Sequence, residues 1–240
     1  MTRTTSARIA GFTLLFYIAV GITQMIVARG ATSGEGTAAR MASIATHTVQ
    51  LRINVVLTLV ICLTALTLAV ALYVITRDDD QELALLALAC RAIEGAIPVI
   101  SILATLGVLS LATAAAADAP NAAASYPLAA FLLNLKGWLP LIGATFFAVG
   151  SALFSWLLLR GRIVPASLAW LGVAASVLLV LGLPLQLVGG LRGTVTQLMW
   201  IPMAAFEIPL GFWLLIKGVR EPTAHVSVTE TRQTWPQRTG

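Results

Sequence analysis

Three charged side chains stand inside apolar stretches that are long enough to cross a bilayer: Arg91, Glu94 and Glu207. A charge at the centre of a membrane span costs roughly 2.5–3.5 kcal/mol on insertion scales, so each of these groups needs a partner. Arg91 and Glu94 are three residues apart, which places them on one face of a helix. An arginine beside carboxylates in a membrane can act as an ion-pair lock, a proton relay or a ligand site.

Glu207 is expected at the same depth as Arg91. Arg91 lies eight residues into an apolar run that begins at Leu83, and Glu207 precedes Lys217 by ten residues. At 1.5 Å per residue, both side chains are roughly 12–15 Å deep, near the middle of a hydrocarbon core about 30 Å thick. We therefore predict that the third and sixth spans touch there, with Glu94 and Glu207 both near Arg91.

Prolines stand beside this polar centre. Pro98 follows Glu94 by four residues, and Pro209 follows Glu207 by two. Proline has no N–H, so each one removes a helical hydrogen bond and leaves a carbonyl free. Water, neighbouring helices or a ligand can satisfy such carbonyls, and transporters use broken helices at their sites. The sequence favours the interpretation that these charges form a structural ion-pair lock. A transport or proton-relay site and a buried ligand site are the alternative interpretations.

The remaining polar residues do not form a recognisable catalytic site. His47 and His225 both lie outside the apolar runs, and the sequence has no His-Glu-x-x-His, phosphate-loop or Cys-x-x-Cys motif. No serine has a histidine at matching depth to activate it. We therefore expect a protein that is not an enzyme and that uses no cofactor and no metal, with carboxylate chemistry at Glu207 as the open alternative.

Three consecutive aspartates, Asp78 to Asp80, follow the second apolar run. They invite a metal-site hypothesis. Helix capping is the stronger interpretation, because acidic residues at a helix start accept hydrogen bonds from free N–H groups and complement the helix dipole. Asp79 and Glu82 have the spacing of a capping box, so we predict a cap at this position.

The elements that hold these residues are predicted to be membrane-spanning helices. Of the 240 residues, 58% are hydrophobic and 10% are charged, whereas about 25% of residues are charged in soluble domains. Apolar runs of about 20 residues are the signature of transmembrane helices. We predict an all-α integral membrane bundle in one domain, residues 1–219, with six spans at about residues 9–28, 53–75, 83–109, 139–159, 167–188 and 197–216.

The connections carry weaker signals. Met41, Ile44 and Val49 recur at helical spacing, which predicts a short amphipathic helix on the membrane surface before the second span. Residues 113–125 are predicted to be a loop, and residues 126–137 a half-buried helix leading into the fourth span. Residues 220–240 are polar without a periodic apolar face, which predicts a disordered cytoplasmic tail.

The distribution of basic residues predicts the topology. Alternate connections, including both termini, hold nine Lys and Arg, against four or five on the other side. The positive-inside rule therefore places both termini in the cytoplasm of a multi-pass protein in the bacterial cytoplasmic membrane. The net charge of +5 is scattered over loops and tails, whereas a nucleic-acid site needs clustered charge. The expected partner is the lipid bilayer, with a membrane-protein partner or a homo-oligomer left open.

The chain resembles a family of bacterial membrane proteins grouped as domain of unknown function 4386, over about Arg8–Val219. The resemblance rests on the order and spacing of short motifs: Arg8-Ile9-Ala10-Gly11, Ala71-Leu72-Tyr73, Arg91, Phe146-Phe147 with Gly150, Pro165, Leu168, Leu171-Gly172, Glu207, Trp213-Leu214-Leu215 and Lys217-Gly218-Val219. It implies a multi-span bacterial membrane protein and supplies no activity. The leading hypothesis is a structural or accessory bundle with an Arg–Glu centre; the alternative is a small transporter or proton-coupled carrier that uses Glu207 and Arg91.

Overall fold

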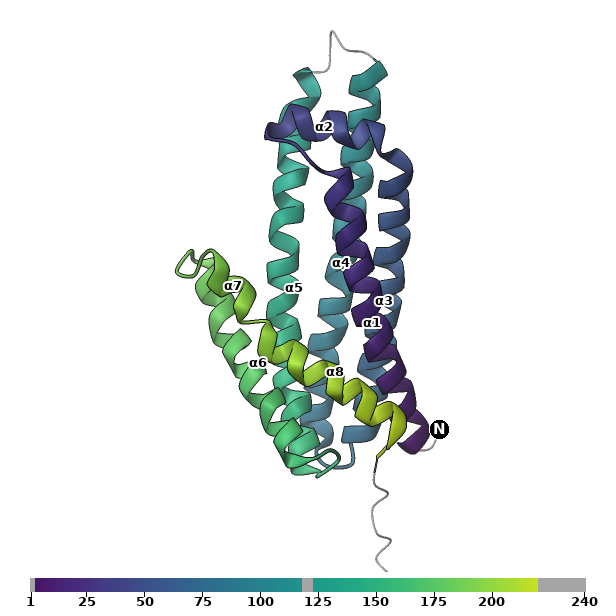
Figure 1. Cartoon of the computed structure of the whole chain (residues 1–240), viewed down its shortest axis with the longest axis vertical. Helices are drawn as coiled ribbons and strands as arrows, with labels where there is room; N and C mark the ends of the chain where they lie inside the picture. Colours follow the sequence, from purple (N-terminus) through teal and green to yellow (C-terminus); the bar gives the residue numbers. More distant parts are fainter. Residues whose placement is uncertain (1–2, 118–122, 220–240) are drawn as a thin grey trace, which may run out of the picture.

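The computed structural model describes residues 3–117 and 123–219, and the regular elements of this part of the chain are helices (Figure 1). Six of its helical segments are long and apolar enough to cross a membrane. The prediction of an all-α membrane bundle with six spans is therefore confirmed. The helices are α1 (Arg3–Ala31), α2 (Gly36–Thr46), α3 (Thr48–Thr76), α4 (Gln81–Ala117), α5 (Tyr126–Arg160), α6 (Ala166–Leu187), α7 (Thr194–Leu198) and α8 (Ile201–Ile216), with the last two forming the sixth span.

The helix bounds correct one expectation about the connections. Helix α4 continues to Ala117, so the loop predicted from residue 113 was wrong in its first part, because alanine is the best helix former and the Ala-rich run extends the helix. Helices α4 and α5 also continue through Pro98 and Pro140. The prediction of a helix leading into the fourth span is confirmed, since α5 begins at Tyr126. The predicted tail, residues 220–240, lies outside the described residues.

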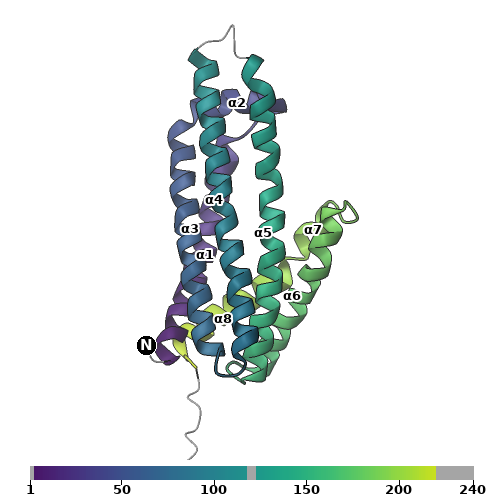
Figure 2. The same ribbon diagram turned by 180° about the vertical axis from the view of Figure 1, so that it is seen from behind.

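Two of the helices are much longer than a bilayer is thick. Helices α4 and α5 have 37 and 35 residues, so each is on the order of 50–55 Å long at 1.5 Å per residue. Helix α6 has 22 residues, about 33 Å, which matches a hydrocarbon core of about 30 Å. From behind, α3, α4 and α5 stand side by side and rise well past the turn between α6 and α7 (Figure 2).

Helix α2 lies across the end of the bundle where α4 and α5 project (Figure 1). Its Met41 and Ile44 are 3% and 2% exposed and pack with Leu109 and Ala112 of α4 and Ala129 of α5. The short helix expected before the second span is therefore present, and its buried apolar side chains pack against α4 and α5. The projecting ends of α4 and α5 offer it an apolar surface within the protein itself.

Helix α8 runs obliquely across the other half of the bundle and packs mainly against α1 and α6 (Figure 1). Its crossing with α1 is made by two glycines. A Cβ atom on Gly11 would lie 2.5 Å from the backbone nitrogen of Leu215 and 2.6 Å from the carbonyl oxygen of Gly211. Small residues of this kind let helix backbones approach closely.

The start of α1, the α3–α4 turn, the α5–α6 turn and the end of α8 meet at one end of the bundle, here named the N-terminal end (Figure 1). Arg3 lies 3.7 Å from both Asp78 and Asp79 and donates a hydrogen bond to the carbonyl of Ile75 at 2.6 Å. Arg160 pairs with Asp80 at 3.0 Å. The aspartates thus join three segments of the chain.

Helix capping at this turn comes from a different aspartate than expected. The N–H of Leu83 donates to Oδ1 of Asp80 at 3.1 Å, so Asp80 caps α4. Asp79 instead faces Arg3, and an added Cβ on Gly161 would collide with its carboxylate. The predicted capping role at the turn is therefore confirmed, but its assignment to Asp79 was wrong.

Candidate functional site

Arg91 is one of the most deeply buried side chains of the structure, with 2% of its surface exposed. Its Nη1 atom lies 3.6 Å from Oε2 of Glu94 on the same helix. The guanidinium also lies over the ring of Phe147 on α5, 4.6 Å from the ring centroid, in a cation–π contact. Room for the side chain comes from Gly150, where an added Cβ would be 2.9 Å from Cγ of Arg91.

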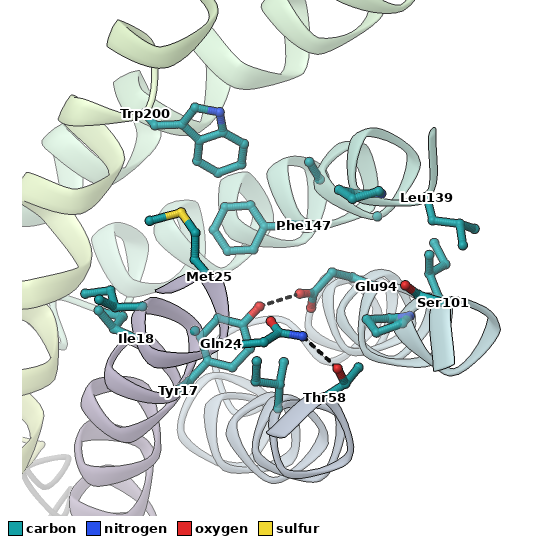
Figure 3. A pocket seen from close by; sticks show the side chains of 18 of the residues that line it. Tyr17, Ile18, Gln24, Met25, Thr58, Glu94, Ser101, Leu139, Phe147 and Trp200 are labelled. Atoms are coloured by element: carbon teal, nitrogen blue, oxygen red, sulfur yellow. Dashed lines mark hydrogen bonds between the residues drawn. The ribbon is translucent and has the colours of Figure 1, made fainter. Parts of the chain in front are cut away.

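Glu94 links this pair to α1. Its Oε1 atom accepts a hydrogen bond from the hydroxyl of Tyr17 at 2.9 Å (Figure 3). Oε2 faces Arg91 without a hydrogen bond among the described residues. Side chains of α1, α4 and α5 therefore meet in one cluster, here named the polar centre: Arg91, Glu94, Tyr17 and Phe147.

Glu207 lies beside the polar centre but forms no ion pair within the described part of the chain. It shares with Arg91 the lining of a small void, which Ser151, Ser155 and Phe206 help to enclose. Glu207 and Arg91 thus lie near each other although α8 runs obliquely (Figure 1), whereas the depth calculation assumed a rise along the bundle axis. The ion pair of Arg91 is accordingly with Glu94, its own helix neighbour.

A cavity of about 610 Å³ opens on the other side of Glu94. Its size falls within the roughly 300–1,000 Å³ that is usual for small-molecule sites. Glu94 and Glu207 both line it, together with aromatic, apolar and uncharged polar side chains. The principal lining residues come from five helices: Tyr17, Ile18, Ile22 and Gln24 of α1; Thr58 and Ile61 of α3; Ile97, Pro98 and Ser101 of α4; Leu139, Gly143 and Phe147 of α5; and Trp200 at the start of α8.

The walls of the cavity are held by short contacts between helices. Nε2 of Gln24 donates to the hydroxyl of Thr58 at 2.6 Å, which joins α1 to α3 (Figure 3). The rings of Phe147 and Trp200 lie 5.9 Å apart between centroids. Gly143 faces the side chain of Ile97 at an ordinary van der Waals distance, so a side chain there has room to enter the cavity.

Spacing along the chain pointed to Arg91, Glu94 and Glu207, but it did not reveal Tyr17, Phe147 or Trp200. Tyr17 lies 77 residues from its partner Glu94, and no local pattern connects two residues so far apart. A signal was nevertheless present. A tyrosine in the middle of an apolar run needs a buried hydrogen-bond partner, whereas interfacial tyrosines stand at span ends.

This arrangement brings together ionisable side chains of both signs beside a cavity. The polar centre holds one arginine against one carboxylate, and Glu207 adds a second carboxylate at the cavity wall. Within residues 3–117 and 123–219, no group of three or more His, Cys, Asp or Glu is placed to hold a metal ion.

The fold and the site define a class: α-helical, multi-span membrane proteins with a charged centre beside an open cavity between the helices. A family model described as a domain of unknown function, DUF4386, matches residues 9–218, and the chain belongs to this family. The comparisons with curated proteins and with solved structures gave no match.

Proposed function

We propose that this chain is a multi-pass protein of the bacterial cytoplasmic membrane that has no catalytic role and that holds a small amphiphilic molecule in the cavity beside Glu94. The proposed topology has both termini in the cytoplasm. It is supported by the basic residues Arg3, Arg77, Arg160 and Lys217, which lie on segments that meet at the N-terminal end of the bundle. The positive-inside rule assigns such an end to the cytoplasm.

The two halves of the site have different roles in this proposal. Arg91, Glu94 and Tyr17 form a structural lock that fixes the positions of α1 and α4. The cavity is the proposed ligand site, because its volume lies in the range that is usual for small-molecule sites. The observation that carries the proposal is a cavity of about 610 Å³ that is lined by two carboxylates and by aromatic rings.

Filling the cavity tests the proposal. Wild-type protein purified in native lipid is expected to retain a small molecule that native mass spectrometry detects. Gly143→Phe places a ring in the cavity and is expected to remove that molecule. Gly137→Phe adds the same ring on the same helix at an exposed position with open space around it, and is expected to leave the molecule bound. Equal retention by all three proteins would contradict a ligand role for the cavity.

A carrier role is the second candidate, and the position of Glu207 favours it. Glu207 lines the cavity on one side and the small void that reaches Arg91 on the other. A carboxylate between two compartments of the interior can exchange a proton or cargo between them when the helices move, and transporters place such groups near the bilayer midplane.

Proteoliposomes with an internal pH-sensitive dye test the carrier role. Wild-type protein is expected to conduct protons when a pH gradient is imposed, and Glu207→Gln is expected to abolish the flux while the protein still elutes as a folded species. A wild-type flux equal to that of empty liposomes would exclude proton-coupled transport. An undiminished flux in Glu207→Gln would exclude Glu207 as its carrier group.

A further inference from the structure

The charges that face the cavity are both negative. Among its lining residues, all within the described part of the chain, the ionisable acids are Glu94 and Glu207, and neither Lys nor Arg is present. Arg91 lies behind Glu94, against the ring of Phe147 and outside the lining. With one arginine for two carboxylates, the region has one negative charge in excess when all three groups are ionised. An uncompensated charge in a low-dielectric interior is costly, so the cavity is suited to a positive charge.

Glu94 contributes further hydrogen-bond acceptors near this wall. Glu94 is 8% exposed, and its Oε2 atom has no hydrogen-bond partner among the described residues. Pro98 lines the cavity and has no N–H, so the carbonyl of Glu94 lacks its helical donor. Because Oε2 of Glu94 is turned toward Arg91, the carboxylate of Glu207 is the countercharge that this wall leaves for a cation.

Aromatic rings and aliphatic side chains complete the site. Tyr17, Phe147 and Trp200 all line the cavity, with Phe147 and Trp200 on the side away from Tyr17 in Figure 3. The face of an aromatic ring attracts a cation within about 6 Å, and the attraction is strongest where water is excluded. Ile18, Ile22, Ile97 and Leu139 supply an apolar surface for the rest of a ligand.

We propose that the cavity binds a lipophilic cation, an amphiphile whose ammonium or other positive head lies between Glu207, Glu94 and the aromatic rings and whose apolar body lies along the aliphatic wall. This inference rests on the proposed function and names the chemical class of its ligand. Glu207 supplies the free countercharge, because Glu94 is already opposite Arg91.

Two ions of the same shape and opposite charge test the proposal: tetraphenylphosphonium and tetraphenylborate. Binding of each is measured by equilibrium dialysis against the protein in lipid nanodiscs, with empty nanodiscs subtracted. Tetraphenylphosphonium is expected to bind saturably and tetraphenylborate is not. Glu207→Gln is expected to weaken tetraphenylphosphonium binding by roughly tenfold or more, since a buried countercharge is lost. Glu207→Asp is expected to retain binding.

A matched control removes a carboxylate elsewhere. Glu82→Gln changes the same residue type at an exposed position in the first turn of α4, and is expected to leave the affinity for tetraphenylphosphonium unchanged. Elution in size-exclusion chromatography verifies that each variant is folded.

The outcomes separate this inference from the function on which it rests. Saturable binding of tetraphenylborate that Gly143→Phe removes would overturn the charge assignment and leave the cavity as a ligand site. Binding of tetraphenylphosphonium that is unchanged in Glu207→Gln would overturn the role of Glu207 and, with it, the proposal. Absence of binding of both ions would overturn the proposal as well, while the co-purification experiment with Gly143→Phe decides the proposed function separately.

Discussion

The side chain of Arg91 is almost fully buried, and three neighbouring residues accommodate it. Glu94 supplies a countercharge, Phe147 presents its ring face, and Gly150 leaves space for the aliphatic part of the side chain. The distance of 3.6 Å between Nη1 and Oε2, without a hydrogen bond, shows an electrostatic contact rather than a tight bidentate pair. The arginine therefore depends on several neighbours at once.

Removing one partner of this pair is expected to destabilise the bundle strongly. Arg91→Leu leaves the carboxylate of Glu94 buried without its countercharge, which costs about 3–5 kcal/mol in comparable buried pairs. The double variant Arg91→Leu/Glu94→Leu removes both charges and is expected to recover much of that loss. Unfolding in mixed detergent micelles measures both effects. A single variant as stable as the wild type would show that the pair is not a lock.

The position of α8 is determined by close helix contacts more than by polar groups. It crosses α1 where Gly11 and Gly211 allow the two backbones to approach, and it places Glu207 and Trp200 at the cavity. Gly172 of α6 makes a similar contact, because an added Cβ there would lie 2.5 Å from the ring of Phe206. Small residues thus determine where α8 lies, and α8 completes one wall of the site.

Gly11→Ala is expected to displace α8 and to reduce stability by about 1–3 kcal/mol, as overpacking does in well-packed interiors. The atoms in the way belong to the backbone of Leu215 and Gly211, so no side chain can turn aside. Gly21→Ala on the same helix is the control, since an added Cβ there has no atom within 4 Å. Equal unfolding midpoints for the two variants would show that the crossing is not tightly packed.

The N-terminal end joins distant parts of the whole molecule. Arg3 of α1 and Arg160 of α5 face the aspartates of the α3–α4 turn. This network therefore connects α1 and α5 to the turn between α3 and α4. Asp79 is the most constrained of the three, between Arg3 and the backbone at Gly161. Burial raises the pKa of its carboxyl and the neighbouring Asp78 adds to this, while Arg3 and Arg160 oppose the rise.

This pKa shift predicts how stability changes with pH. A carboxyl whose pKa is raised on folding stabilises the protein below the ordinary aspartate pKa of about 3.9, and this contribution is lost as pH rises through the folded value. Asp79→Asn stays neutral, so its unfolding midpoint is expected to exceed that of the wild type at pH 7 and to converge with it toward pH 4.

Asp78→Asn is the control for that experiment. It removes the same charge from a side chain that is 55% exposed, and is expected to change the midpoint less. A lower midpoint for Asp79→Asn than for the wild type at pH 7 would mean that attraction to Arg3 outweighs the cost of burial.

The features that could be predicted from the sequence are those that depend on residues close together in the chain. Hydropathy located all six spans, and the i,i+3 spacing of Arg91 and Glu94 placed both on one face of a helix. The cavity could not be foreseen, because five helices that are far apart in the sequence line it and one of them, α8, takes an oblique course. The contact of Tyr17 with Glu94 and the burial of α2 likewise depend on which helices become neighbours.

The location of the ion pair within a single helix has a consequence for synthesis in the membrane. Each centrally placed charge costs roughly 2.5–3.5 kcal/mol at the insertion step. Arg91 and Glu94 face each other within α4 itself, so their pairing needs no other span and this segment can enter the bilayer with its charges paired. Glu207 has no acid or base beside it in α8, which belongs to the sixth span of the described residues. Five spans precede it, so the walls that receive its carboxylate are made before it arrives.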